Sequence, residues 1–210
     1  MRISAQNTGT CVQAWKESGT HWFPYARRNI MASAVHTYIL TALFTALTSI
    51  SSFIRVPFPL VPITAQTLFV YMSGNILGSK RGAVSQVLFL AVGLCGLPVF
   101  AMGGGIGYVL KPSFGYLLAF PFAAWVSGRA HHSREAGTFI RANIYAALVI
   151  FVSGSVYLYT ASNLFLHVPV TIFQAVLAGF LVFVPGEIVK IAAAGVLCAK
   201  LQDAARRIEL

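Results

Sequence analysis

The sequence predicts an all-α integral membrane protein with six transmembrane helices and an external loop region rich in proline and glycine. Hydrophobic residues make up 57% of the 210 residues and charged residues only 10%, whereas soluble domains usually carry about a quarter charged residues. Mean hydropathy is +0.75, and several apolar runs approach the roughly 20 residues that cross the hydrocarbon of a bilayer. The basic residues lie at the ends of these runs, as membrane topology requires.

The apolar runs divide the chain into three parts. Residues 1–30 are polar and basic, and they contain no apolar core of a signal peptide. We expect them to form a poorly ordered cytoplasmic arm, or to reflect a mis-assigned start, since Met31 directly precedes the first apolar run. Residues 31–201 form the membrane domain, and residues 202–210 form a cytoplasmic tail.

The membrane domain contains six expected spans. They are residues 31–54, 63–77, 83–97, 111–128, 142–165 and 185–201. A further apolar segment, 170–184, is interrupted by Pro185 and Gly186, and we expect a short or re-entrant helix there. Pro185 then occupies the first turn of the sixth span, where proline is well tolerated.

Two connections between the spans have an unusual composition. Residues 57–62 contain three prolines, which cannot continue a helix and predict a stiff extended connection. Residues 96–108 are rich in glycine but lack the spacing of a phosphate-binding loop. The glycines, which include Gly103 and Gly104, instead allow the backbone to approach a ligand or a neighbouring helix closely.

The distribution of basic residues orients the six spans. Twelve of the fifteen lie on one side, in the arm, the turn at Lys80, the loop 129–141 and the tail, whereas only Arg55 and Lys111 lie on the other. The positive-inside rule therefore places both termini in the cytoplasm. The proline-rich connection, the glycine-rich loop and the break at Pro185 then all face outside.

The net charge of +10 does not indicate a nucleic-acid partner, because the basic residues follow the ends of apolar runs rather than one face with interleaved aromatics. The three cysteines are isolated and show no zinc spacing. His131 and His132 lie in a polar loop where histidines are usually solvated. We therefore expect no metal site, no cofactor and no catalytic residues.

Glu187 and Lys190 are the candidate site. They are three residues apart, so on a helix they share one face, and Glu187 is the only acid in any apolar segment. Each charge alone costs about 2.5–3.5 kcal/mol at mid-bilayer, so the two must pair, face a polar cavity or lie near the interface. They form either an ion pair that fixes helix packing or the polar end of a ligand site. A carboxylate and an ammonium together suit a cyclic urea or an amide.

Several polar residues and a pair of alanines have two interpretations. Thr64 is either a helix cap or, with Gln66, a polar lining at the mouth of a cavity. Ala42 and Ala46 lie one turn apart and allow another helix to approach closely, either within this chain or in a partner.

No H-E-x-x-H or G-x-S-x-G motif indicates an intramembrane enzyme. Proton-coupled secondary transport through Glu187 remains an alternative.

Five motifs in order resemble the BioY family, the biotin-binding membrane subunits of energy-coupling-factor (ECF) transporters. The motifs are residues 61–68 (VPITAQTL), 77–83 (LGSKRGA), 93–100 (GLCGLPVF), 112–117 (PSFGYL) and 185–190 (PGEIVK). The resemblance implies a six-helix prokaryotic cell-membrane protein that binds biotin from outside. It also implies partners: a coupling membrane subunit, which would dock at Ala42 and Ala46, and a pair of cytoplasmic ATPases.

The resemblance also implies site residues. An acid and a lysine on the last helix bind the ureido ring in the family, and here these are Glu187 and Lys190. We expect the remaining contacts to come from Thr64, Gln66, Tyr116, Gly103, Gly104 and Lys111, with Lys111 attracting the valerate carboxylate. The family usually has Asp where this chain has Glu187, and a smaller residue where it has Phe114. These departures predict a reshaped site for biotin or a related vitamin.

Overall fold

The computed structural model describes residues 22–57, 61–133, 135–164 and 170–209. The chain forms two compact units, Met1–Ile39 and Leu40–Leu210, and the candidate site lies in the second. Residues 1–21, which make up most of the predicted arm, lie outside the described part of the chain.

The first described helix, α2 (Trp22–Ser51), begins nine residues before the predicted start at Met31 and contributes residues to both units. Pro24 falls in its first turn, where a missing N–H group costs nothing. From Leu40 onward α2 lies against α4 (Ser79–Leu94). Thr45 Oγ1 donates a hydrogen bond to the carbonyl of Ser85 at 2.9 Å, and Gln86 Nε2 donates to Thr48 Oγ1 at 3.3 Å.

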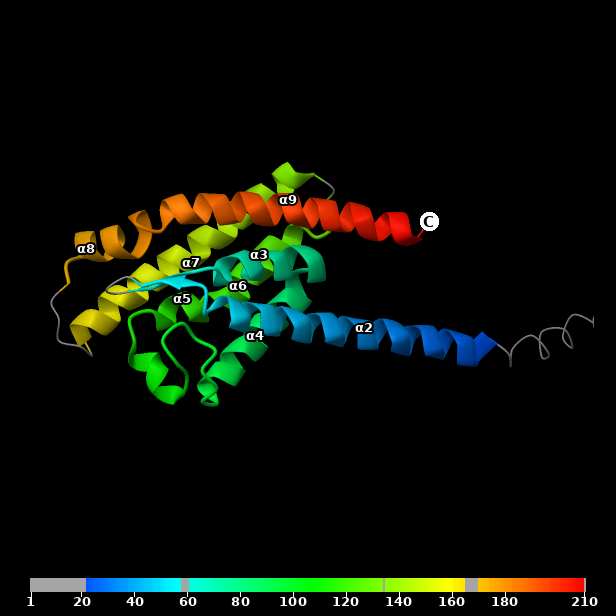
Figure 1. Ribbon diagram of the computed structural model, residues 1–210, viewed down its shortest axis with the longest axis horizontal. Helices are drawn as coiled ribbons and strands as arrows, with labels where there is room; N and C mark the ends of the chain where they lie inside the picture. Colours follow the sequence, from blue (N-terminus) through cyan, green and yellow to red (C-terminus); the bar gives the residue numbers. More distant parts are fainter. Residues whose placement is uncertain (1–21, 58–60, 134, 165–169, 210) are drawn as a thin grey trace, which may run out of the picture. The chain divides into compact units, whose positions relative to one another are not determined.

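Two short strands flank the proline-rich connection, of which residues 58–60, including Pro59, lie outside the described part of the chain. Strands β1 (Arg55–Val56) and β2 (Ile63–Thr64) pair antiparallel, with Arg55 opposite Thr64. Pro57 follows β1 and Pro62 precedes β2, where a missing N–H ends a strand. The hairpin leads directly into α3 (Gln66–Leu77), so Thr64 lies at the head of that helix (Figure 1).

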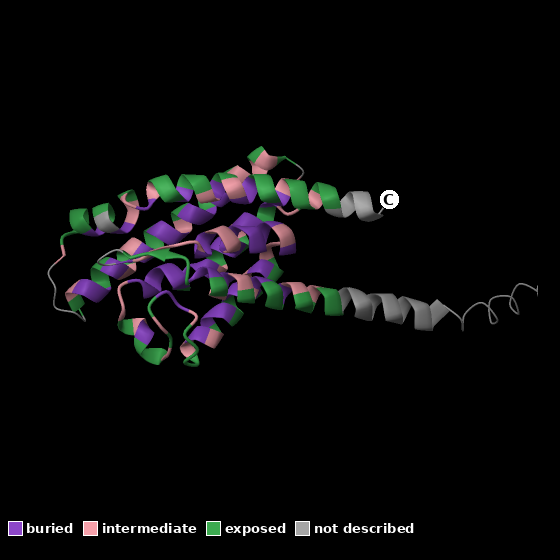
Figure 2. Ribbon diagram, in the orientation of Figure 1, coloured by how far each residue is buried: buried purple, intermediate pink, exposed green. Residues whose placement is uncertain are grey.

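Helix α3 is buried on most of its surface and packs against three other helices, α4, α6 (Phe120–Ser127) and α9 (Val184–Glu209). Figure 2 shows how burial concentrates on α3 and on the short helices beside it. Glycines allow this packing. A Cβ on Gly74 would lie 2.3 Å from the carbonyl oxygen of Ala124, and one on Gly82 would lie 2.8 Å from the Cα of Gly74. Small residues therefore let α3, α4 and α6 meet backbone to backbone.

The predicted span 111–128 is not one helix. It contains α5 (Phe114–Leu118) and α6, separated at Ala119, after the short helix η1 (Ile106–Leu110) and before η2 (Gly128–Ala130). Pro121 lies in the first turn of α6. Because Pro121 clashes with the carbonyl four residues earlier and donates no hydrogen bond, the helix breaks just before it and α6 begins anew with Pro121 in its first turn.

The C-terminal part contains two long apolar helical segments. Helix α7 (Ala136–Leu164) begins six residues before the predicted start, and α9 continues past the predicted end at Leu201. Between them lie α8 (Ile172–Val176) and the π-helical turn η3 (Leu177–Leu181). Among the described residues, Ala136–Leu164 and Ile172–Ala204 are long and apolar enough to cross a membrane. Pro185 lies in the first turn of α9, as predicted.

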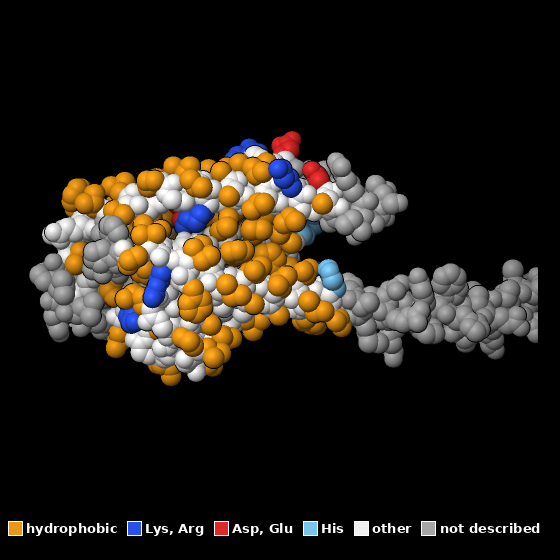
Figure 3. Space-filling model, viewed as in Figure 1, with side chains coloured by type: hydrophobic (Ala, Val, Ile, Leu, Met, Phe, Trp, Pro, Cys, Tyr) orange, Lys and Arg blue, Asp and Glu red, His pale blue; other side chains and the backbone are white. Residues whose placement is uncertain are grey.

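The surface is predominantly apolar. Large hydrophobic side chains are exposed along α7 and α9, among them Val152, Val156, Ile188 and Val189. In the face that Figure 3 shows, hydrophobic side chains cover most of the described surface and charged ones are few. A surface of this kind is suited to contact with lipid, because exposure of apolar side chains to water is unfavourable.

Candidate ligand-binding site

Glu187 and Lys190 form an ion pair in the first two turns of α9. Lys190 Nζ lies 2.6 Å from Glu187 Oε2, and only 3% of Glu187 is exposed. The prediction that the two side chains share one helix face is confirmed, since they meet at a spacing of three residues. The two charges therefore neutralise each other at a position that is largely shielded from water.

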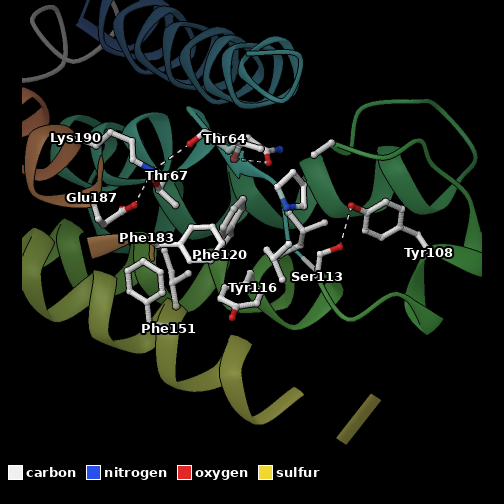
Figure 4. Close-up of a pocket in the computed structure, with 16 residues that line it drawn as sticks. Thr64, Thr67, Tyr108, Ser113, Tyr116, Phe120, Phe151, Phe183, Glu187 and Lys190 are labelled. Carbon is white, nitrogen blue, oxygen red and sulfur yellow. Dashed lines mark hydrogen bonds and ion pairs between the residues drawn. The ribbon is translucent and has the colours of Figure 1, made fainter. Parts of the chain in front are cut away.

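Partners from α3 and β2 complete the bonding of both charges. The phenol of Tyr71 donates to Glu187 Oε1 at 2.5 Å. Lys190 Nζ donates to Thr67 Oγ1 at 2.7 Å and to the carbonyl of Thr64 at 3.1 Å, so all three ammonium hydrogens have acceptors. Figure 4 shows the Lys190 side chain reaching toward Thr64 and Thr67, with Glu187 beside it. The pair thus connects α9 to α3 and to the hairpin.

The same charges lie at one end of a cavity of about 50 Å³. The interpretation as an ion pair that only fixes packing is therefore incomplete, because the pair also borders free space. The cavity is lined by Val61, Pro62, Thr64, Gln66, Thr67, Ala101, Tyr108, Ser113, Tyr116, Leu117, Phe120, Ile150, Phe151, Phe183, Glu187 and Lys190.

Aromatic side chains form one wall of this cavity. The ring of Tyr116 lies 6.2 Å from that of Phe183 and 6.4 Å from that of Phe151, measured between centroids. Figure 4 shows these rings with Phe120 below the polar groups. The Tyr116 hydroxyl donates to the carbonyl of Gly179 at 2.8 Å. That carbonyl belongs to the π-helical turn η3, so Tyr116 both lines the cavity and supports the break before α9.

Gln66, which lines the cavity, has a side-chain hydrogen-bond donor that is not used. Its side chain is only 2% exposed. Gln66 Oε1 accepts from Thr64 Oγ1 at 3.1 Å, whereas Gln66 Nε2 is buried and has no partner among the described residues. An unmade hydrogen bond on a buried donor costs about 1–3 kcal/mol, so a ligand that accepts from this amide would recover that free energy.

A second polar group lies toward the glycine-rich loop. Ser113 Oγ donates to the hydroxyl of Tyr108 at 3.3 Å, and both residues line the cavity. Burial raises the pKa of Tyr108 above its usual value, so the phenol stays neutral at physiological pH and is able to donate or accept a hydrogen bond.

The structure brings five of the predicted substrate-binding residues to one cavity and leaves three away from it. Glu187, Lys190, Thr64, Gln66 and Tyr116 line the cavity, whereas Gly103, Gly104 and Lys111 do not.

The three residues outside the cavity have other contacts. Lys111 Nζ donates to the carbonyl of Met102 at 2.8 Å and lies 4.9 Å from the centre of the Tyr108 ring. Gly103 has a φ of +113°, and a Cβ on Gly104 would lie 2.0 Å from the carbonyl oxygen of Leu97. These glycines therefore let the loop fold onto itself, and their predicted contact with a ligand stays a prediction.

The two predicted docking residues and Phe114 also have clear positions. Ala42 and Ala46 are both exposed on α2, one turn apart on its surface. Phe114 is buried, and its ring lies 5.9 Å from that of Tyr157 and 6.5 Å from that of Tyr108. Phe114 does not line the cavity, although the Tyr108 ring that it contacts does.

Several site residues were not predicted from the sequence. Thr67 and Tyr71 contact the pair and lie four residues apart on α3, a spacing that places their polar groups on one helical face. That spacing was a usable signal. No comparable signal marks Phe120, Phe151 and Phe183, because the chain has 16 phenylalanines and most of its apolar runs contain aromatic residues.

No group of three or more His, Cys, Asp and Glu side chains that could hold a metal ion occurs in the part of the chain that the structure describes. The arrangement is suited to binding rather than to bond breaking, since the acid and the base neutralise each other.

Known proteins share this sequence and fold. The model of the BioY family matches residues 25–207. A probable biotin transporter BioY of Lysinibacillus sphaericus is 39% identical over 178 residues, which is 82% of this chain and 91% of that protein. The biotin transporter BioY of Thermotoga maritima is 32% identical over 165 residues, 78% of this chain and 94% of that protein.

The fold has a counterpart among solved structures. The crystal structure of the S-component for biotin from an ECF-type ABC transporter has a TM-score of 0.73 and 27% identity with this chain, and the match covers 82% of this chain and 93% of that one. The family model spans most of the sequence, and the relatives cover more than two thirds of it at over 30% identity. The resemblance found in the five motifs is thereby confirmed, and the chain belongs to the BioY family.

Proposed function

We propose that this protein is the substrate-binding membrane subunit that captures biotin from outside the cell for ATP-driven uptake. The observation that supports this most directly is the cavity at Glu187 and Lys190, where a buried ion pair, an unused amide donor on Gln66 and an aromatic wall meet. Relatives over more than three quarters of the chain are named biotin transporters.

The ion pair suits the ureido ring. A cyclic urea carries two N–H donors and one carbonyl acceptor. Glu187 would accept from an N–H, and Lys190 would donate to the carbonyl. Tyr71 holds Glu187 Oε1 in place, which fixes the carboxylate despite the extra methylene that Glu has over Asp. The apolar bicycle would then lie against Phe183 and the other rings of the wall.

The other end of the ligand carries a carboxylate, and donors are available for it. Gln66 Nε2 has no partner among the described residues, and the Ser113 and Tyr108 hydroxyls border the cavity. Lys111 lies beyond Tyr108, outside the cavity wall. We assign it a long-range role, in which its charge attracts the carboxylate and raises the rate of association.

Binding requires the hairpin to move. The cavity volume of about 50 Å³ is far below the roughly 300–1,000 Å³ of most small-molecule pockets. Val61, Pro62 and Thr64 of the hairpin region form part of its wall, and Thr64 is held by Lys190. A ligand carbonyl that accepts this hydrogen bond from Lys190 would replace the Thr64 carbonyl. Ligand binding would therefore free the hairpin to open.

Six transmembrane segments and cytoplasmic termini are part of the proposal. Helices α3, α4 and the α5–α6 pair are each shorter than the roughly 20 residues of a full span, so they would cross as shorter, closely packed segments. The excess of basic residues in the arm, the turn at Lys80 and the loop 129–141 supports this orientation. The cavity would then face outside.

Coupling to ATP hydrolysis would come from partner proteins. Ala42 and Ala46 present a small-residue surface on α2 that another helix can approach closely, and we assign it to the coupling membrane subunit. In Ala46→Leu we expect biotin binding to remain and uptake in cells to fall. A variant that still transports at the wild-type rate would remove this assignment.

The decisive experiment is calorimetry of the purified protein with biotin and with lipoate, which has the valerate chain but no urea. We expect tight binding of biotin and affinity for lipoate lower by about 100-fold or more, since at least two hydrogen bonds to charged groups are lost at about 1.5–3 kcal/mol each. Equal affinity for the two would reject the role of the ion pair. Accumulation of biotin in vesicles without ATPases, driven by a pH gradient, would instead favour proton-coupled transport.

A further inference from the structure

A second concave site lies between α6, η2 and α7, and it shares no lining residue with the Glu187–Lys190 cavity. Its volume is about 760 Å³. Two arginines line it, Arg129 from η2 and Arg141 from the start of α7, together with Thr138, Tyr145, Leu148 and Val149. Nothing in the proposed capture of biotin uses these residues.

The two guanidinium groups are held in place but have no negative partner among the residues that the structure describes. Arg129 lies 4.1 Å from the centre of the Trp125 ring, and Arg141 Nη2 donates to Thr138 Oγ1 at 3.2 Å. Both arginines are exposed. The ion pair found in the described part of the chain is Glu187 with Lys190, and Glu135, which directly precedes α7, pairs with neither arginine. Arginine forks match the oxygens of a phosphate group.

The rest of the groove is apolar and continues along α7. Tyr145 is 64% exposed and Leu148 is 45% exposed, and both lie farther along the helix than Arg141. Leu148 also borders a second, almost wholly apolar cleft between α7 and α9, which Ile144 and Ile188 line. The groove thus combines a cationic end with an apolar path at least two helical turns long.

We propose that this groove binds an anionic phospholipid, with the phosphate at Arg129 and Arg141 and an acyl chain along Tyr145 and Leu148. Charge complementarity supports a phosphate, because two arginines without carboxylate partners face one cavity. The exposed apolar path supports a lipid over a soluble phosphate ester, since a soluble anion would leave that path uncovered. Basic pockets between membrane helices are a recurrent site for acidic lipid head groups.

Trp125 provides the measurement, because its ring lies directly beneath Arg129. The chain has three tryptophans, so the variant Trp15→Phe/Trp22→Phe leaves Trp125 as the sole reporter. The full-length protein is placed in nanodiscs that contain phosphatidylcholine and a varied fraction of phosphatidylglycerol, with bromine on the acyl chains of one lipid at a time. Quenching of Trp125 then gives the relative affinity of the two lipids at this groove.

We expect phosphatidylglycerol to be preferred by about fivefold for each arginine, the factor associated with one basic residue near an anionic surface. In Arg129→Gln/Arg141→Gln the preference should disappear. The matched control Arg81→Gln, which removes an exposed charge at the start of α4, should keep the wild-type ratio. Gel filtration of each variant establishes that it is folded.

Three results would overturn the proposal. The first is equal quenching by the two brominated lipids in the otherwise wild-type protein. The second is a loss of preference in Arg81→Gln as large as in the double variant, which would indicate general surface charge. The third is release of phosphatidylglycerol by millimolar glycerol 3-phosphate, which would indicate a site for a soluble phosphate ester.

Discussion

Lys190→Met tests the central part of the proposed site. Methionine has nearly the length of lysine and no charge, so the change removes the ammonium and leaves the volume almost unchanged. In the structure the ammonium has contacts of 2.6, 2.7 and 3.1 Å with Glu187 Oε2, Thr67 Oγ1 and the carbonyl of Thr64. All three contacts are lost together.

The structure gives the size of the effect. Removal of one partner from a buried ion pair costs about 3–5 kcal/mol, because the remaining charge is left uncompensated. Tyr71 still donates to Glu187, which places the expected loss of stability near the lower end. For binding, the lost contact to the ligand carbonyl is one hydrogen bond to a charged group, about 1.5–3 kcal/mol. The Kd for biotin should therefore rise about 10- to 150-fold.

Calorimetry with biotin measures the affinity, and thermal unfolding measures the stability. The matched control is Lys80→Met, an exposed lysine on α4, for which both quantities should be unchanged. The double variant Glu187→Gln/Lys190→Met separates the two roles of the pair. It removes both charges, so stability should recover, whereas binding should remain weak because no ammonium meets the urea.

The reasoning would be refuted if Lys190→Met bound biotin with a Kd within about twofold of the wild type, which corresponds to less than 0.5 kcal/mol. It would also be refuted if the double variant recovered wild-type affinity. Either result would mean that the ion pair fixes helix packing and that the ligand binds elsewhere.

Three further predictions concern other residues of the site. Gln66→Met removes the unused donor Nε2, so biotin affinity should fall by about 3- to 10-fold, the effect of one neutral hydrogen bond. The unfolding temperature should stay the same or rise. Lower stability with unchanged affinity would contradict this prediction. Tyr116→Phe removes the bond to the Gly179 carbonyl in η3 and should lower stability by about 1–3 kcal/mol in thermal unfolding, and an unchanged midpoint would show that this carbonyl finds another donor. Lys111→Met should raise the Kd for biotin by at most about fivefold, the size of an exposed charge effect. In stopped-flow measurements the change should lie in the association rate and should disappear at high salt. A change in the dissociation rate would count against the long-range role.

Much of the fold could be predicted from local features of the sequence. The position of Pro185 in the first turn of α9 followed from the tolerance for proline at that position. The three prolines predicted an extended connection, but the antiparallel pairing of β1 with β2 did not follow from them, because composition alone does not determine which residues pair. The predicted span 111–128 was wrong as a single helix, since Pro121 divides it, and that signal was present in the sequence.

Helix boundaries were less well predicted. Helices α7 and α9 continue past the apolar runs that predicted them, because polar residues at a helix end extend beyond the hydrocarbon without cost. The contacts of Gly103 and Gly104 could not be assigned from composition, since glycine permits close approach to a ligand and to backbone alike.

From the residue pattern alone it follows that two opposite charges share one helix face among apolar residues, because helical periodicity requires it. The cost of an isolated charge in hydrocarbon implies that they pair, face a polar cavity or lie near the interface. The five motifs in order also identify the family. Which groups surround the pair depends on how the helices pack. Tyr71, Thr67 and Phe183 come from elements far apart in the chain, and their meeting depends on how α3 and α9 pack. The groove at Arg129 and Arg141 likewise exists only where two helices converge, since a cavity belongs to the space between elements and no single segment encodes it.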